Sequence, residues 1–153
     1  MDHTFQLYNA GTGMEPWVRA ALVKFISAFS PGIPPSNIRD AIDCVLKNIP
    51  SFGGFVVVAW SDRTLAGAIV VNRTGMSGFG PENLLTFAVA PGEGTGAQIL
   101  LEALIRKGMD YTEGEIAYHL PLRHPALKLF QDLGFKRQFV ELRFSPEKLK
   151  AEA

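Results

Sequence analysis

Three alternating glycines, Gly92, Gly94 and Gly96, are the part of the sequence best suited to chemistry. They follow the β-prone run Leu84–Val89 and precede a segment with helical spacing of apolar residues. Glycines at such a junction let the backbone approach a phosphate closely, and the free N–H groups and dipole of the following helix attract the anion. A tight turn that binds nothing uses the same residues. The strand-then-helix context favours an anion site.

Two nucleotide-binding motifs overlap this segment in part. Gly92-x-Gly94-x-x-Ala97 matches the dinucleotide fingerprint, and Glu113 or Glu115 follows at roughly the spacing of twenty residues that this motif uses. That fold opens with the motif and needs several parallel strands, whereas an antiparallel hairpin is expected before it here. A Walker A loop needs a lysine after the last glycine, and this chain has none there. Both motifs are therefore disfavoured.

The three histidines and the single cysteine show no metal-ligand spacing. They are His3, His119, His124 and Cys44. Structural zinc sites draw on cysteines and histidines that recur a few residues apart, so we expect no metal. Cys44 falls in an amphipathic helical segment and is interpreted as a small packing residue.

A mixed-sheet α/β domain with the element order βααβββαβαβ is expected to position these residues. Period-two and continuous apolar runs predict strands at 5–8, 55–60, 65–72, 84–89, 116–120 and 139–144. Helical spacing predicts helices that carry apolar residues from Val18 to Phe29, Ile38 to Ile49, Ile99 to Ile105 and Pro125 to Leu133. Thr12 and Glu15 have the spacing of a capping box before the first helix. The prediction of the last strand depends on the alternation of apolar residues from Phe139 to Phe144.

Length, composition and charge limit the classes of protein to which this chain can belong. A chain of 153 residues fits one domain, 1–153, with a polar tail from about 145. Lys plus Arg and Asp plus Glu number 15 each, so we expect no nucleic-acid partner and no membrane association. The longest clear apolar run, Phe55–Trp60, is too short for a membrane span. Met1–Thr4 lacks a signal-peptide pattern, so a cytoplasmic location is expected.

Three segments carry a family resemblance when they are taken with the element order. They are Leu84–Pro91, Gly92–Leu100 and His124–Phe135. They are similar to the fourth strand, the pyrophosphate loop with its helix, and the Asn-x-Ala…Leu-Tyr-x-x-x-Gly-Phe segment of the GNAT superfamily of acyl-CoA-dependent N-acetyltransferases. The resemblance covers about Phe55 to Phe144. It implies one domain with a mostly antiparallel sheet, splayed between the fourth and fifth strands, and helices on both faces.

The resemblance also implies where acetyl-CoA lies. The pantetheine arm would pair with the fourth strand like an added strand, and N–H groups of the glycine loop would hold the pyrophosphate. His124 stands where the family's helix often starts with asparagine, and it either contacts the pantetheine or caps the helix. The cofactor residues implied in this way are Phe87, Ala88, Val89, Gly92, Gly94, Thr95, Gly96, Ala97, His124 and Phe130.

Three positions depart from the family pattern. Pro91 meets Gly92 directly, without the few residues that the family usually has between them. Glu93 brings a carboxylate into the loop. Phe130 stands where a tyrosine often protonates the leaving thiolate. A thiolate can leave unassisted, because the pKa of a thiol is not far from neutral.

Two residues are candidates for the base that an attacking amine needs. His119 falls late in the fifth strand, and imidazole exchanges protons near neutral pH. Glu82 precedes the fourth strand. The alternative interpretations are that His119 is an ordinary strand histidine and that Glu82 is a solvated loop carboxylate. Tyr118 could serve as the acid only if it faces the cleft.

The function predicted on these grounds is transfer of an acetyl group from acetyl-CoA to a primary amine of a small molecule or protein. The alternative is a CoA-binding sensor or partner-binding module that has lost catalysis. The loops Ser30–Pro35 and Thr74–Asn83 would choose the acceptor, with Phe29, Met76 and Phe79 as an apolar wall. A homodimer is left open.

Overall fold

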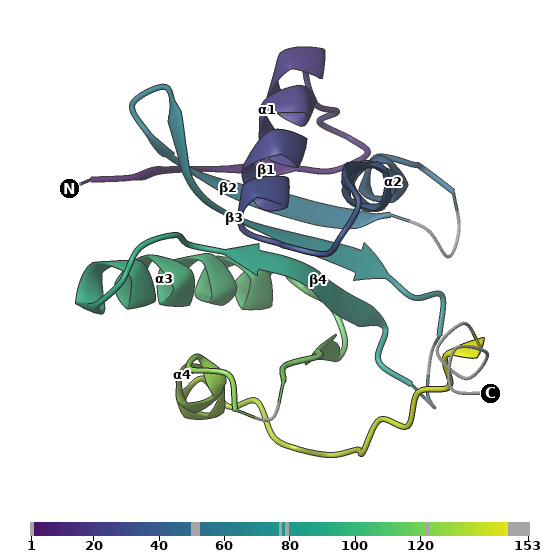
Figure 1. Ribbon diagram of the computed structural model, residues 1–153. Coiled ribbons are helices and arrows are strands. Elements are labelled where there is room, and N and C mark those ends of the chain that lie inside the picture. Colours follow the sequence, from purple (N-terminus) through teal and green to yellow (C-terminus); the bar gives the residue numbers. More distant parts are fainter. Residues whose placement is uncertain (1, 50–52, 77, 79, 122, 147–153) are drawn as a thin grey trace.

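The computed structural model describes residues 2–49, 53–76, 78, 80–121 and 123–146. These residues form one mixed α/β arrangement, and its elements follow the predicted order as far as the last helix (Figure 1). The elements are β1 (Thr4–Tyr8), α1 (Pro16–Ala28), α2 (Pro35–Val45), β2 (Gly54–Ser61), β3 (Thr64–Arg73), β4 (Asn83–Val89), α3 (Thr95–Tyr111), β5 (Ile116–Tyr118) and α4 (Leu127–Asp132).

The sheet has the order β1-β2-β3-β4-β5, which is also the order of the chain. The first four strands pair antiparallel, whereas β5 runs parallel to β4. A parallel pair needs a crossover, and α3 provides it. The mostly antiparallel sheet predicted from the sequence is confirmed.

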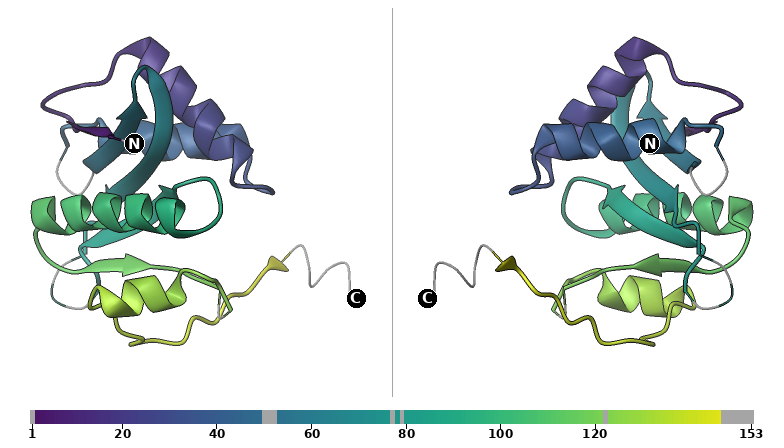
Figure 2. Two further views of the ribbon diagram at one scale, coloured as in Figure 1. Left: turned by 90° about the vertical axis from the view of Figure 1, so that its left-hand side faces the viewer. Right: turned by 90° about the vertical axis from the view of Figure 1, so that its right-hand side faces the viewer.

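Strand β2 separates two hydrophobic cores. Its side chains alternate between the faces, so Val56 and Val58 pack with α1 and α2 while Val57 and Ala59 pack with α3 and α4. This explains why 55–60 is a continuous apolar run rather than an alternating one. Helices on both faces are confirmed (Figures 1 and 2). None of the helices described is long and apolar enough to cross a membrane.

The capping box predicted before α1 is wrong. The Thr12 hydroxyl accepts a hydrogen bond from the Asn9 N–H at 2.9 Å, and the Asn9 side chain accepts from the N–H groups of Gly11 and Thr12. A turn closed by Asn9 therefore takes the hydroxyl that the helix was expected to use. Helix α1 begins at Pro16, which has no backbone N–H and therefore needs no capping partner there.

The predicted last strand, 139–144, is also wrong. These residues pair with no strand among those described, and their large apolar side chains are exposed. Alternation gives a segment the propensity for a strand, but a strand forms only beside a partner edge. After α4 the Phe135 ring packs on Phe130, and the chain then runs away from the body of the molecule (Figure 2).

Candidate functional site

Strands β4 and β5 part after a very short contact. Their register comprises three pairs, which end at Leu85 and Tyr118. From Phe87 to Val89, β4 has a register partner only in β3. The last half of β4 therefore presents an open backbone edge, and the splay predicted between the fourth and fifth strands is confirmed.

A set of hydrogen bonds, which we call the apex clamp, joins Glu82 and Asn83 to residues 113–115. Buried Asn83 donates through Nδ2 to the Glu113 carbonyl oxygen at 2.7 Å and to the Glu115 carbonyl oxygen at 3.2 Å. The Glu82 carboxylate accepts from the Glu115 N–H at 2.7 Å. That N–H lowers the pKa of Glu82. The clamp fixes the closed end of the gap between β4 and β5.

A register shift marks the point where β4 leaves β5. Phe87 faces Val70 and Leu85 faces Val71, so Thr86 is an extra residue on β4. Its hydroxyl lies 3.0 Å from the Val70 carbonyl oxygen and 2.5 Å from Asn72 Oδ1. Such bulges bend a strand and redirect the groups that follow. The bend begins where the backbone edge becomes open.

The glycine loop lies beyond the open edge, at the start of α3. Gly92 and Gly94 have φ values of 109° and 88°, which side chains rarely adopt. A Cβ at Gly94 or Gly96 would meet nothing within 4 Å, so there is free space above the loop. No side chain caps α3. The first N–H groups of this 17-residue helix therefore remain open to an anion.

The two candidate bases lie at different ends of the gap. His119 is exposed and directly follows β5, beyond the last pair with β4. Glu82 belongs to the apex clamp at the closed end, and a carboxylate bonded to a backbone N–H is a weaker base. Tyr118 packs on Phe130 with 4.9 Å between ring centroids, and burial raises its pKa.

The two residues implied by the third segment have local partners. His124 Nδ1 accepts from the Ala126 N–H at 3.1 Å, just before α4. Phe130 is 2% exposed and belongs to the core beneath β5. Their cofactor roles stay predictions. His124 makes a local contact in the turn before α4, which has no side-chain capping hydrogen bond, and Phe130 packs in the core.

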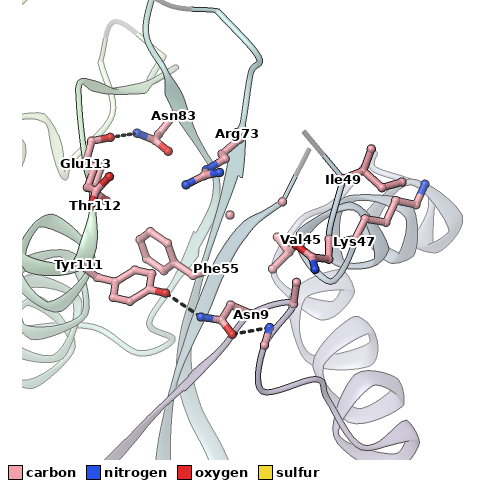
Figure 3. Close-up of a pocket in the computed structure, with 15 residues that line it drawn as sticks. Asn9, Val45, Lys47, Ile49, Phe55, Arg73, Asn83, Tyr111, Thr112 and Glu113 are labelled. Atoms are coloured by element: carbon pink, nitrogen blue, oxygen red, sulfur yellow. Dashed lines mark hydrogen bonds between the residues drawn. The ribbon is translucent and has the colours of Figure 1, made fainter. Parts of the chain in front are cut away.

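A hollow lies at the other end of β4 (Figure 3). Its volume is about 520 Å³, and Asn9, Phe55, Arg73, Asn83 and Tyr111 are among the residues that line it. Asn9 Nδ2 donates to the Tyr111 hydroxyl at 2.6 Å across its wall. It contains none of the predicted cofactor residues. Within the described part of the chain, no three His, Cys, Asp or Glu residues could hold a metal ion.

Solved acetyltransferase structures share this architecture over nearly the whole chain. The aminoglycoside N-acetyltransferase AAC(6')-Iy, solved with the bisubstrate analogue CoA-S-monomethyl-acetylneamine, superposes with a TM-score of 0.67 at 15% identity, covering 95% of this chain and 98% of that one. The chain has the GNAT fold. AAC(6')-IG from Acinetobacter haemolyticus aligns with a TM-score of 0.62 at 11% identity over 93% of this chain and 97% of its own. The sisomicin complex of the aminoglycoside acetyltransferase meta-AAC0020, from an uncultured soil metagenomic sample, gives 0.60 at 13% identity over 94% and 95%. No family model and no curated protein matches the sequence.

Sequence reasoning missed the residues that shape the GNAT-fold gap. Asn83 and Thr86 bear polar side chains within a strand that was identified by its apolar residues. Polar residues inside such a strand are one available signal, because a buried polar group must find a partner. The sequence does not show which partner that is, since residues 113–115 lie beyond a whole helix.

Proposed function

We propose that this chain transfers an acetyl group from acetyl-CoA to a primary amine. One observation carries the proposal: the open edge of β4 leads directly into a glycine loop and an uncapped helix. An open strand edge suits the amide groups of a pantetheine arm, and free N–H groups at a helix start suit a pyrophosphate. The GNAT-fold neighbour solved with a CoA bisubstrate analogue supports the same ligand here.

The backbone groups at the open edge and the glycine loop fit the chemistry of acetyl-CoA. Backbone groups of Phe87, Ala88 and Val89 would bind the pantetheine, because β5 no longer pairs with β4 at these positions. The N–H groups from Gly92 to Ala97 would bind the pyrophosphate, with Thr95 and Gly96 in the first turn of α3. Glu93 is exposed in the same loop, and its carboxylate would oppose the phosphates at close range.

In this proposal the neutral amine attacks the thioester carbonyl carbon directly. The new C–N bond forms, the carbonyl electrons collapse back, and the C–S bond breaks to release the CoA thiolate. His119 takes the proton from the amine nitrogen, since it is exposed where β5 has left β4. The thiolate leaves without a side-chain acid, because Phe130 has no hydroxyl. Glu82 is the second candidate base, although its carboxylate already accepts a hydrogen bond.

A small molecule bearing an amine is the acceptor that we propose. Exposed Phe29 and Met76 offer apolar contacts on the two loops expected to face it. Phe79, expected in the same wall, lies outside the described residues. Solved neighbours carry aminoglycosides.

The test combines binding and turnover. Acetyl-CoA should raise the melting temperature by mass action, and an amine panel should then release free thiol. Desulfo-CoA serves as the control, since it should stabilise the protein without releasing thiol. The absence of any shift at millimolar acetyl-CoA contradicts the proposal.

A CoA-binding sensor without catalysis is the second candidate function. Two observations favour it: the residue in the family's tyrosine position is a buried phenylalanine, and a carboxylate sits in the glycine loop. Binding of acetyl-CoA without thiol release across a wide amine panel would identify a sensor.

A further inference from the structure

The hollow of Figure 3 is a second concave site, and it lies apart from the open edge of β4 and the glycine loop. Its walls come from the loop after β1, the end of α2, the start of β2, the end of β3, the start of β4 and the end of α3. The glycine loop follows the other end of β4. A volume of about 520 Å³ lies within the range in which proteins bind small molecules. The hollow therefore has the size of a ligand site.

Arg73, the last residue of β3, supplies a cation to this hollow. Its guanidinium points into the hollow (Figure 3), and it forms no ion pair with any of the described carboxylates. Lys47 and Glu113 are the other charged residues of the lining, so positive charge predominates there. A guanidinium left free in a concave site is suited to bidentate binding of a carboxylate. The charge of the hollow therefore favours an organic anion.

The hydroxyl of Tyr111 is a second donor at the wall of the hollow. Its oxygen accepts from Asn9 Nδ2 at 2.6 Å, and no described residue accepts its hydrogen. Asn9 is itself held, because its Oδ1 accepts from the N–H groups of Gly11 and Thr12, each at 2.9 Å. The Tyr111 ring packs edge-on against Phe55 with 4.8 Å between centroids. Contacts within the protein therefore hold the hydroxyl and both rings in place before a ligand binds.

The rest of the lining is largely apolar side chain or bare backbone. Val45, Ile49 and Phe55 contribute apolar groups. Gly53 and Gly54 also line the hollow, and a Cβ at Gly54 would lie 1.9 Å from a backbone oxygen of β3. Glycine is therefore required at that position, and this part of the wall carries no side chain. Such a lining suits the flat body of an aromatic ligand.

We propose that this hollow binds a small aromatic carboxylate. The carboxylate accepts hydrogen bonds from the Arg73 guanidinium and the Tyr111 hydroxyl, and the ring packs beside Tyr111, Phe55 and Ile49. The two donors and the excess of positive charge select an anion, while the apolar lining selects an organic body over an inorganic ion. The site shares no residue with the proposed acetyl-CoA site, so the proposal does not depend on the enzymatic function.

The first test is a titration of isotope-labelled protein with benzoate, in which NMR follows the backbone amides. The amides of Gly53, Gly54 and Thr112 should shift and saturate at millimolar benzoate or below, whereas those of the glycine loop should not move. Benzamide keeps the ring without the charge, and inorganic phosphate keeps the charge without the ring. Each should bind more weakly than benzoate by about tenfold or more, because each lacks one half of the recognition.

The second test replaces the cation. Arg73→Gln should weaken benzoate binding by about tenfold or more. Arg63→Gln is the matched control, because Arg63 is an exposed arginine in the turn between β2 and β3, outside the hollow, and it should leave the affinity unchanged. Thermal unfolding should show that both variants remain folded.

Four results would overturn the proposal. The first is that no amide of the hollow moves at millimolar benzoate, and the second is that Arg73→Gln leaves the benzoate affinity unchanged. The third is that benzamide or phosphate binds as tightly as benzoate. The fourth is that acetyl-CoA displaces benzoate, which would place the carboxylate in the gap between β4 and β5 instead.

Discussion

Replacing Gly96 with alanine should move fold stability and ligand binding in opposite directions. Gly96 lies in the first turn of α3 without a positive φ, and a Cβ there would meet no atom within 4 Å. Alanine in a helix is more stable than glycine by up to about 1 kcal/mol, because it loses less backbone entropy. For a chain of this length that corresponds to a melting temperature higher by about 2–4 °C.

The same methyl group should weaken CoA binding. If the pyrophosphate rests against the N–H groups of the glycine loop, a methyl group in that space lengthens the contacts. We expect the Kd of CoA to rise at least tenfold, which corresponds to about 1.4 kcal/mol. Thermal unfolding without ligand and calorimetric titration with CoA measure the two effects on one protein.

Gly94→Ala provides the contrast within the loop. Gly94 has a φ of 88°, so alanine is strained there and should lower stability as well as affinity. An unchanged CoA Kd in a stable Gly96→Ala protein would remove the loop from the binding site. A fall in stability would refute the view that the space above Gly96 is open.

Four further predictions follow from the described contacts. His119→Ala should lower kcat by about a hundredfold and abolish the acid limb of the pH–rate profile, with the acetyl-CoA Kd unchanged; His3→Ala is the control, and an unaltered kcat would dismiss His119 as the base. Because the Glu115 N–H lowers the pKa of Glu82 below its ordinary value of 4.5, that bond stabilises the fold above this pH and is lost as pH falls through the lowered pKa. Glu82→Gln should therefore reduce the loss of folding stability that acid causes. A variant whose stability depends on pH in the same way as that of the wild type would contradict the apex clamp. Gly54→Ala should cost about 3 kcal/mol, since its Cβ would lie 1.9 Å from the Val71 carbonyl oxygen at a φ of 125°; a melting temperature within a degree of wild type would be inconsistent with this packing. Glu93→Gln should tighten CoA binding modestly at low salt and less at high salt, as measured by titrations at two ionic strengths. An affinity that the substitution leaves unchanged at both would show that the carboxylate lies far from the phosphates.

Periodicity predicted the fold well because it reports on burial. The continuous run 55–60 indicated a strand covered on both faces, and β2 lies between two cores. The helical spacing of Leu100, Leu104 and Ile105 placed these residues on the buried side of α3, whereas Ile99 of the same predicted set is 61% exposed. Such patterns are local, so they can be identified without knowing what covers them.

The sequence could not show which distant segments of the chain pack or pair with one another. The alternation at 139–144 is typical of a strand, yet the segment pairs with none of the described strands and its apolar side chains are exposed. The apex clamp joins Asn83 to residues 113–115 across α3, and no periodicity encodes a contact between such distant segments. The role of Phe130 was likewise decided by three-dimensional packing against Tyr118 and Phe135.

The agreement between strand order and chain order has a consequence for how the molecule folds. Antiparallel β2, β3 and β4 can form in succession from neighbouring segments, whereas β5 must wait until α3 has crossed the sheet. Only three residue pairs then hold β5, so this strand can open locally while the rest of the sheet stays intact. We therefore expect this wall of the gap to assemble after β2, β3 and β4 and to exchange its amide hydrogens sooner than they do. A ligand that binds both walls would slow that exchange by linking β5 to the stable part of the sheet.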